Sequence, residues 1–136
     1  MPPRLILLHK QATSARLRFL CLPTGVTAFA PLPALSTLYP EDYSPKIELH
    51  PTATIRDAEH RLGLEEGSIE PEAGFHAWVD TSAGNLPIVL GVFTTTDPPF
   101  EAAERLGAKF ISITDARRLS EIERELLRRA YEHMLG

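Results

Sequence analysis

Residues 75–95 have the sequence FHAWVDTSAGNLPIVLGVFTT, and this stretch decides the fold. Two strand-forming runs, Phe75–Asp80 and Leu86–Thr95, flank a short segment of turn-forming residues, which predicts a β-hairpin. If Gly84-Asn85 is the two-residue turn, Trp78 falls opposite Gly91, where its ring covers a strand glycine. The second strand is apolar on both faces as far as residue 93, which predicts a place at the centre of a sheet.

Strand patterns also occur on both sides of this hairpin. The three segments 4–9, 15–22 and 26–30 are joined by connections too short for a crossover helix, which predicts an antiparallel meander. Residues 46–50 alternate between polar and apolar side chains, with Ile47 and Leu49 on one face. A short apolar run at 109–113 predicts the last strand. The acidic stretch 65–72 is predicted to be a solvated loop.

Three helices are predicted from their ends and their apolar stripes. The first begins with Thr54 as its cap and ends at Gly63. The second begins at Asp97-Pro98, a good cap followed by a residue that suits the first helical position, and ends at Gly107. The third follows the capping box Ser120–Glu123 and continues to about residue 134. Because helices follow strands irregularly, we expect residues 1–136 to form a single α+β domain. Its mixed or mainly antiparallel sheet should have about six to seven strands, with the three helices packed mostly on one face.

Composition and charge favour a cytoplasmic protein without membrane segments. The 136 residues are 43% hydrophobic and 24% charged, which suits one ordinary globular core. No run approaches the roughly 18 apolar residues of a membrane helix, nor the apolar core of a signal peptide. The net charge of −4 is uneven, since residues 1–40 carry four basic residues and no acid. Four scattered charges are too few for a nucleic-acid interface, so nucleic acid is disfavoured as a partner.

The segment 31–45 contains four prolines with Tyr39 and Tyr43 between them. Each proline removes a backbone donor and restricts the residue before it, which predicts an ordered but irregular loop. A loop of this length inside a compact domain is often functional. We therefore expect it to form a lid or to contact a partner.

The candidate ligand-binding residues are His50, His76, Trp78 and Asp80. Three of them, His76, Trp78 and Asp80, alternate along one strand, so they share a face on which an aromatic wall stands between two titratable groups. His76 and Asp80 are about 13 Å apart on an ideal strand, too far to bind one metal ion directly. No metal and no cofactor is predicted, because no phosphate-binding loop or complete metal-ligand motif is present. The alternative to a ligand site is that the polar residues of this face are exposed to solvent and bind no ligand.

Two smaller features outside this face have alternative interpretations. The single cysteine, Cys21, has apolar neighbours and no adjacent base, so it is interpreted as a small packed hydrophobe. Arg117 and Arg118, just before the last helix, could grip a phosphate or carboxylate, but arginines in such a turn are more often solvated.

Two functions remain open from these residues. The first is a small binding or accessory protein that acts through the proline-rich loop and the adjoining sheet face, on an unknown small-molecule or protein partner, as a monomer or homodimer. The second is a small enzyme that acts on a polar metabolite with His76 as acid or base, assisted by Asp80 or His50. An enzyme should gather titratable groups in one cleft, whereas a binding module should expose an apolar patch.

Overall fold

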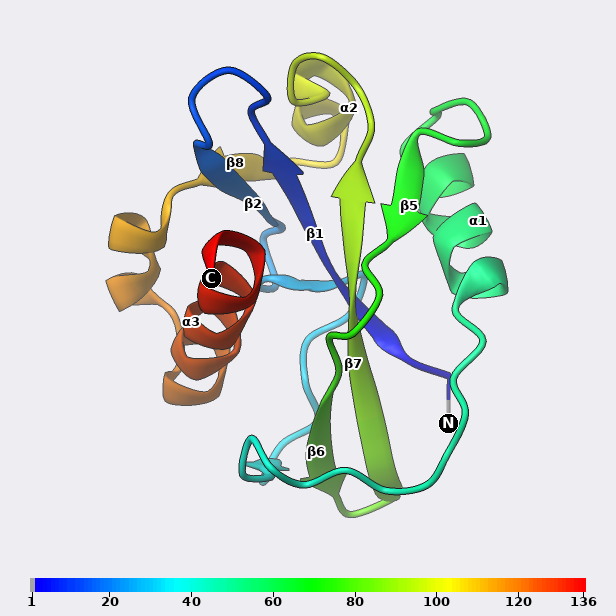
Figure 1. Cartoon of the computed structure of the whole chain (residues 1–136), viewed down its shortest axis with the longest axis vertical. Helices are drawn as coiled ribbons and strands as arrows, with labels where there is room; N and C mark the ends of the chain where they lie inside the picture. Colours follow the sequence, from blue (N-terminus) through cyan, green and yellow to red (C-terminus); the bar gives the residue numbers. More distant parts are fainter. Residues whose placement is uncertain (1) are drawn as a thin grey trace.

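A computed structural model describes residues 2–136 and contains one sheet, three α-helices and a 3₁₀-helix, η1 (Figure 1). The strands, in chain order, are β1 Arg4–Lys10, β2 Leu17–Cys21, β3 Thr27–Ala28, β4 Thr37–Leu38, β5 Ile69–Pro71, β6 Ala77–Thr81, β7 Gly84–Phe93 and β8 Lys109–Ile111. The helices are α1 Thr52–Arg61, α2 Phe100–Arg105, η1 Ile113–Arg118 and α3 Glu121–Leu135. Within residues 2–136, none of these helices is both long enough and apolar enough to span a membrane.

The eight strands form one mixed sheet. The main path runs β4-β6-β7-β1-β2-β8, while β3 pairs with β1 and β5 pairs with β7. The central β1–β7 pair is parallel and the other pairs are antiparallel. The α+β class with a mixed sheet is therefore confirmed.

Both faces of the sheet are covered. Alternate residues of β1 point to opposite faces, so Leu5 and Leu7 pack with α1 and α2, while Ile6 and Leu8 pack with α3 and η1. Two of the three α-helices thus share one face, and the third lies on the other side of the central strands (Figure 1). Because both faces are buried, β1 and β7 are apolar on both sides, as the sequence of β7 predicts.

The hairpin of β6 and β7 is confirmed, but its predicted register is wrong. Thr81 pairs with Gly84, so the turn is Ser82-Ala83 and Trp78 lies opposite Pro87. The side chain of Thr81 stabilises this turn, since its hydroxyl donates to the carbonyl of Gly84 over 2.6 Å and accepts from the Ala83 amide over 3.2 Å. This local hydrogen bonding outweighs the turn propensity of Gly84-Asn85.

Some predicted strands differ from the structure. β3 pairs with β1, so the first three strands are not a simple meander with β2 in contact with β3. Residues 46–50 form no strand ladder, and the Ile47 amide donates to the carbonyl of Pro45 over 2.8 Å. The acidic segment 65–72 contains β5, which was predicted to be solvated loop. Its amides at Gly67 and Ile69 are held by the buried carboxylate of Glu59, at 2.8 and 3.0 Å.

The helix ends show where local signals succeed. The Ser120–Glu123 capping box is confirmed, and α3 ends one residue beyond its predicted end. The first helix begins two residues before Thr54, directly after Pro51, without a side-chain cap. Likewise α2 begins after Pro99, and Asp97 does not cap it. Because consecutive prolines fix the backbone at 98–99, the helix starts later than the Asp97 signal predicts.

Candidate functional site

The candidate site lies in a notch along one edge of β7. Both β5 and β6 pair with β7 on the side away from β1. Between the pairs Pro71–Gly91 and Ala77–Ile88, β7 has only two residues, whereas the opposite chain has five, residues 72–76. The extra residues loop out of the sheet plane, and Gly74, with φ +83°, permits this turn. The excursion leaves a gap in the sheet edge beside Val89 and Leu90.

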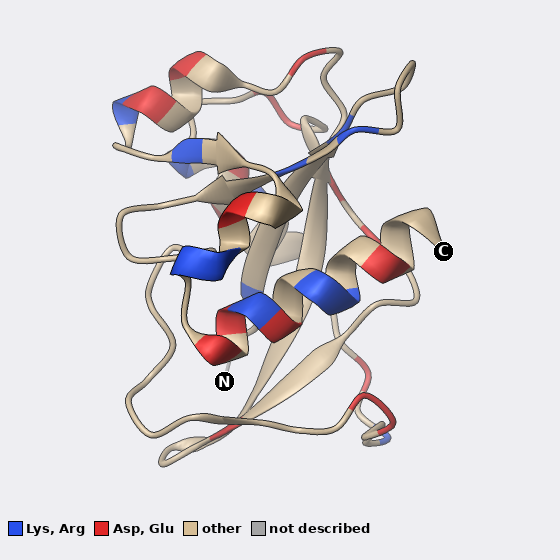
Figure 2. Cartoon of the chain, turned by 90° about the vertical axis from the view of Figure 1, so that its left-hand side faces the viewer, with Lys and Arg blue, Asp and Glu red and all other residues tan. Residues whose placement is uncertain are grey.

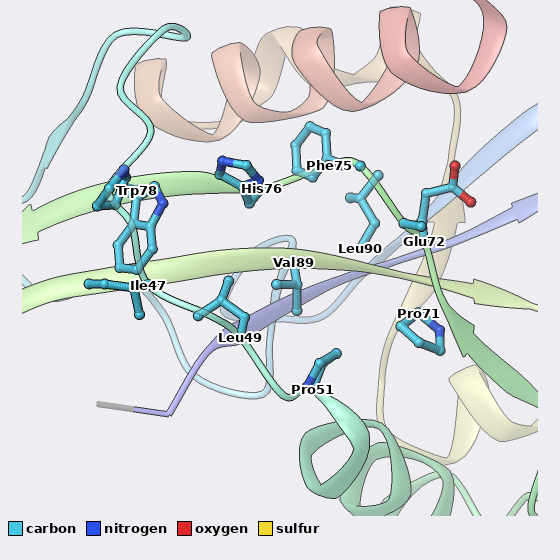
Figure 3. A pocket seen from close by; sticks show the side chains of 13 residues that line it. Ile47, Leu49, Pro51, Pro71, Glu72, Phe75, His76, Trp78, Val89 and Leu90 are labelled. Carbon is cyan, nitrogen blue, oxygen red and sulfur yellow. The ribbon is translucent and has the colours of Figure 1, made fainter.

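A cavity of about 340 Å³ occupies this gap, and we call it the notch cavity. Its walls come from three parts of the chain (Figure 3). They are the segment 45–51 before α1, the facing parts of β6 and β7, and the segment from Pro71 to His76, which we call the 71–76 excursion. Its lining residues are Pro45, Ile47, Leu49, Pro51, Pro71, Glu72, Ala73, Gly74, Phe75, His76, Trp78, Val89 and Leu90. The cavity is mostly apolar, with a few polar groups on its wall, as small-molecule sites are.

Trp78 provides the most informative polar atom of the notch cavity. Its side chain is 4% exposed, yet its indole nitrogen Nε1 has no hydrogen-bond partner among residues 2–136. A buried N–H without a partner costs about 1–3 kcal/mol, so native structures rarely leave one unsatisfied. Trp78 lines the notch cavity but Nε1 itself is fully buried, so an acceptor bound in the cavity reaches this N–H through a small shift of the wall.

The proline-rich loop holds Trp78 from outside the cavity. Tyr43 meets the indole edge-on at 6.4 Å between ring centroids, and Tyr39 stacks on Tyr43 at 4.0 Å. The Tyr39 hydroxyl donates to Asn85 over 2.9 Å, and the Asn85 amide donates to Tyr43 over 3.2 Å. Desolvation and the nearby Asp80 carboxylate raise the pKa of Tyr39, which keeps the hydroxyl protonated as this donor.

His76 lies at the junction between the notch cavity and a second, more polar recess of about 320 Å³. The two share Gly74, Phe75 and His76, and the recess adds Glu41, Arg129, Glu132 and His133. His133 of α3 lies 3.0 Å from the Glu72 carboxylate and contacts the ring of Phe75 edge-on at 5.5 Å. These contacts tie the 71–76 excursion to α3.

The structure brings together two of the four predicted site residues. His76 and Trp78 both line the notch cavity (Figure 3), whereas His50 and Asp80 do not. Asp80 lies near the turn of the hairpin, opposite Thr37 and Asn85. His50 is exposed beside the apolar residues that face the cavity. An acid–base pair of His76 with either residue would therefore not be formed within this cavity.

Sequence reasoning missed Glu72, Phe75 and His133. No local pattern links Glu72 with His133, which is 61 residues away. One signal was present: Ile47 and Leu49 alternate on one face, and both side chains line the cavity without forming a strand, Leu49 half-buried and Ile47 exposed. Within residues 2–136, no group of three or more potential His, Cys, Asp or Glu ligands is placed to hold a metal ion.

Comparison with known proteins adds a likeness of fold. No family model and no curated protein matches the sequence. Among solved structures, the crystal structure of C. elegans Ap4A hydrolase superposes on this chain with a TM-score of 0.55, covering 97% of this chain and 95% of that one. The two sequences are 16% identical over the match, so the likeness concerns the fold and not the residues of a site.

Proposed function

We propose that this protein binds a small molecule that places a planar, acceptor-bearing ring in the notch cavity. The observation that carries the proposal is the buried Trp78 Nε1, which has no partner among residues 2–136. A ring nitrogen or carbonyl oxygen of the ligand would accept this hydrogen bond, and the apolar wall around it would take up the rest of the ring.

The dimensions of the site support a ring and an extension beyond it. A volume of about 340 Å³ is small for a whole drug-sized ligand, so the remainder of the molecule must leave the cavity. The adjoining recess offers that exit past His76, beside Arg129 and His133. In this proposal the loop 31–45 contributes Pro45, which lines the cavity, and Tyr43, which packs against Trp78 from outside it.

Nucleobases are the first ring class to test. They are planar, carry acceptors on their edges, and stack on aromatic side chains. The fold neighbour is named for hydrolysing Ap4A, a nucleotide, which makes this class a reasonable starting point. For this chain we propose binding of the ring of such a ligand, and not hydrolysis of the ligand.

The test uses the fluorescence of Trp78, the only tryptophan in the chain. We expect adenosine, guanosine, cytidine, uridine or Ap4A to change its emission saturably. Trp78→Phe should keep the fold and weaken binding by about three- to tenfold in calorimetry, because it removes one neutral hydrogen bond. Tyr131→Phe is the matched control, since Tyr131 belongs to α3 and lines neither the notch cavity nor the adjoining recess. Failure of the whole panel to change the emission at millimolar concentration would contradict the proposal.

Hydrolysis of a polar metabolite is the second candidate function. It is favoured by the fold likeness to a hydrolase and by the position of His76 between the apolar cavity and the polar recess. Neither His50 nor Asp80 lines the cavity, and their predicted role of assisting His76 as acid or base stays a prediction. Chromatography of Ap4A incubated with the protein decides between the two: a binding protein leaves it intact, whereas an enzyme forms products and loses this activity in His76→Ala.

A further inference from the structure

A separate cavity of about 350 Å³ lies at the opposite end of the sheet, between β2, β8 and η1. Its lining residues are Cys21, Lys109, Phe110, Ile111, Asp115, Arg117, Arg118 and Leu119. We call it the β8–η1 cavity. β8 is the strand at one edge of the sheet, next to β2. The notch cavity lies beyond the sheet centre, beside β6 and β7, and the two cavities share no residue.

Three cationic side chains line the β8–η1 cavity without partners. Within residues 2–136, the exposed side chains of Lys109, Arg117 and Arg118 form no direct ion pair and no hydrogen bond, although the charges of Lys109 and Arg117 help to lower the pKa of Asp115. β8 and η1 both present basic residues on the face turned to the viewer in Figure 2. Of the other nine arginines, Arg56, Arg61, Arg128 and Arg129 contact carboxylates. Arg4, Arg18, Arg105 and Arg124 donate to uncharged oxygen atoms instead. The β8–η1 cavity therefore gathers three cationic side chains around one carboxylate, that of Asp115.

The nearby carboxylates are already engaged by hydrogen-bond donors. Asp115 accepts from the backbone amide of Ser112 over 3.2 Å and from its hydroxyl over 3.0 Å, and these bonds lower the pKa of Asp115. Glu123 accepts the Val26 amide over 2.8 Å and the Ser120 hydroxyl over 2.9 Å. Both acids thus belong to capping boxes, and the charge of Asp115 offsets part of the positive charge of Lys109 and Arg117.

The two arginines stand on a well-anchored turn. η1 begins with a reciprocal capping box, and its Ala116 is buried against the core. Arg124 of α3 donates to the carbonyl of Arg117 over 3.4 Å, which ties the end of η1 to the long helix. The backbone of the two arginines is thus held in place, and their exposed guanidinium groups are free to offer paired N–H donors to an oxyanion.

We propose that the β8–η1 cavity binds the phosphate group of a small phosphorylated molecule. Arg117 and Arg118 donate to the phosphate oxygens, Lys109 supplies the third positive charge, and Phe110 and Leu119 contact the organic part of the ligand. This site is independent of the notch cavity, so its test can fail while the notch proposal holds, and the reverse.

Cys21 serves as a built-in reporter for this site. It is the only cysteine, it lines the cavity, and it lies directly across the strand pair from Lys109. Burial and the Glu123 charge raise the pKa of the Cys21 thiol, while Lys109 opposes this shift. A bound anion covers the thiol and offsets the charge of Lys109, so both effects slow the modification of Cys21.

The experiment measures the rate of Cys21 alkylation by iodoacetamide with inorganic pyrophosphate as the probe. We expect about 10 mM pyrophosphate to slow alkylation by threefold or more, as for a site with a millimolar dissociation constant. Arg117→Gln and Arg118→Gln should each abolish most of this protection. Arg16→Gln removes the same charge from an exposed turn outside the cavity and should leave protection unchanged.

Amide chemical shifts give a second measurement that does not depend on the thiol. Pyrophosphate should shift the signals of residues 109–119 in the intact protein and leave those of residues 71–78 unchanged. The proposal is overturned if pyrophosphate neither slows alkylation nor shifts these amides. Equal loss of protection in Arg16→Gln, or equal protection by citrate, would overturn it too, because the effect would then be general charge screening or carboxylate binding.

Discussion

Gly91 stands where three packed side chains converge on β7. A Cβ atom at this position would lie 2.8 Å from Leu7 Cδ2, 2.9 Å from Ile69 Cγ2 and 3.2 Å from Ile55 Cδ1. The sequence predicts that Trp78 covers this glycine, but the space is instead filled by aliphatic side chains of β1, β5 and α1. Close packing, and not a special backbone angle, therefore requires glycine here.

We expect Gly91→Ala to lower the free energy of unfolding by about 1–3 kcal/mol, because the added methyl overpacks this part of the core. Urea denaturation followed by circular dichroism measures the change. In the double variant Gly91→Ala/Leu7→Val the smaller neighbour should recover part of the loss. Strictly additive effects of the two substitutions would show that the contact with Leu7 is not the cause.

At the scale of single elements, sequence-based prediction succeeds where the stabilising interactions join residues close together in the chain, and fails where they join distant ones. The capping box and apolar stripe of α3 are local signals within 15 residues, and the structure confirms them. The register of the hairpin depends on one side chain, that of Thr81, whose hydrogen bonds compete with the strong turn propensity of Gly84-Asn85. The notch depends on β5 pairing with β7, and β5 lies in an acidic stretch that gives no strand pattern. The buried carboxylate of Glu59, which anchors that stretch, looks in the sequence like any exposed helix acid.

An arginine–carboxylate cluster on α3 makes one element sensitive to acid. Glu125 accepts two hydrogen bonds from Arg128 and one from Arg129, and all three are 2.9 Å or shorter. The hydrogen bonds from Arg128, and then those from Arg129, lower the pKa of Glu125 from its ordinary 4.5 to about 2. Because the folded-state pKa is depressed, the stabilisation is present above pH 4.5 and is lost as the pH falls towards 2.

Glu125→Gln should therefore lower stability by roughly 0.5–1 kcal/mol near pH 7, since the pair is partly exposed and screened by solvent. The difference between the variant and the natural protein should shrink as the pH falls from 4.5 to about 2. Urea denaturation at several pH values measures it. A difference that stays constant over this range would exclude the ion pair as its source.

At the scale of the whole molecule, the two apolar clusters share the same central strands. Leu126, Leu127 and Ala130 of α3 are fully buried on one face, while α1 and α2 cover the other. We expect a single cooperative unfolding transition, because neither cluster can lose its packing without exposing the strand residues behind it. Coincident transitions by circular dichroism and by Trp78 fluorescence would support this; two separated transitions would contradict it.

Removal of residues 120–136 should expose the sheet face that α3 covers and prevent cooperative folding at 25 °C. The loss includes the three fully buried side chains and the His133–Glu72 contact that holds the 71–76 excursion. Thermal denaturation of the shortened chain is the measurement. A truncated protein with an unchanged melting temperature would show that α3 does not contribute to the core.

The parallel pairing of β1 with β7 sets the order in which a newly made chain can fold. β1 is made well before its partner β7, because Arg4 pairs with Ile88 and Leu8 with Val92. Until residue 93 has emerged, one edge of this strongly apolar strand has no native partner and is open to aggregation. The hairpin with β2 can form early, whereas closure of the sheet centre must await a contact of high sequence separation, which is intrinsically slow. During synthesis the sheet centre therefore cannot close before β7 is available, and until then the unpaired edge of β1 needs protection from aggregation.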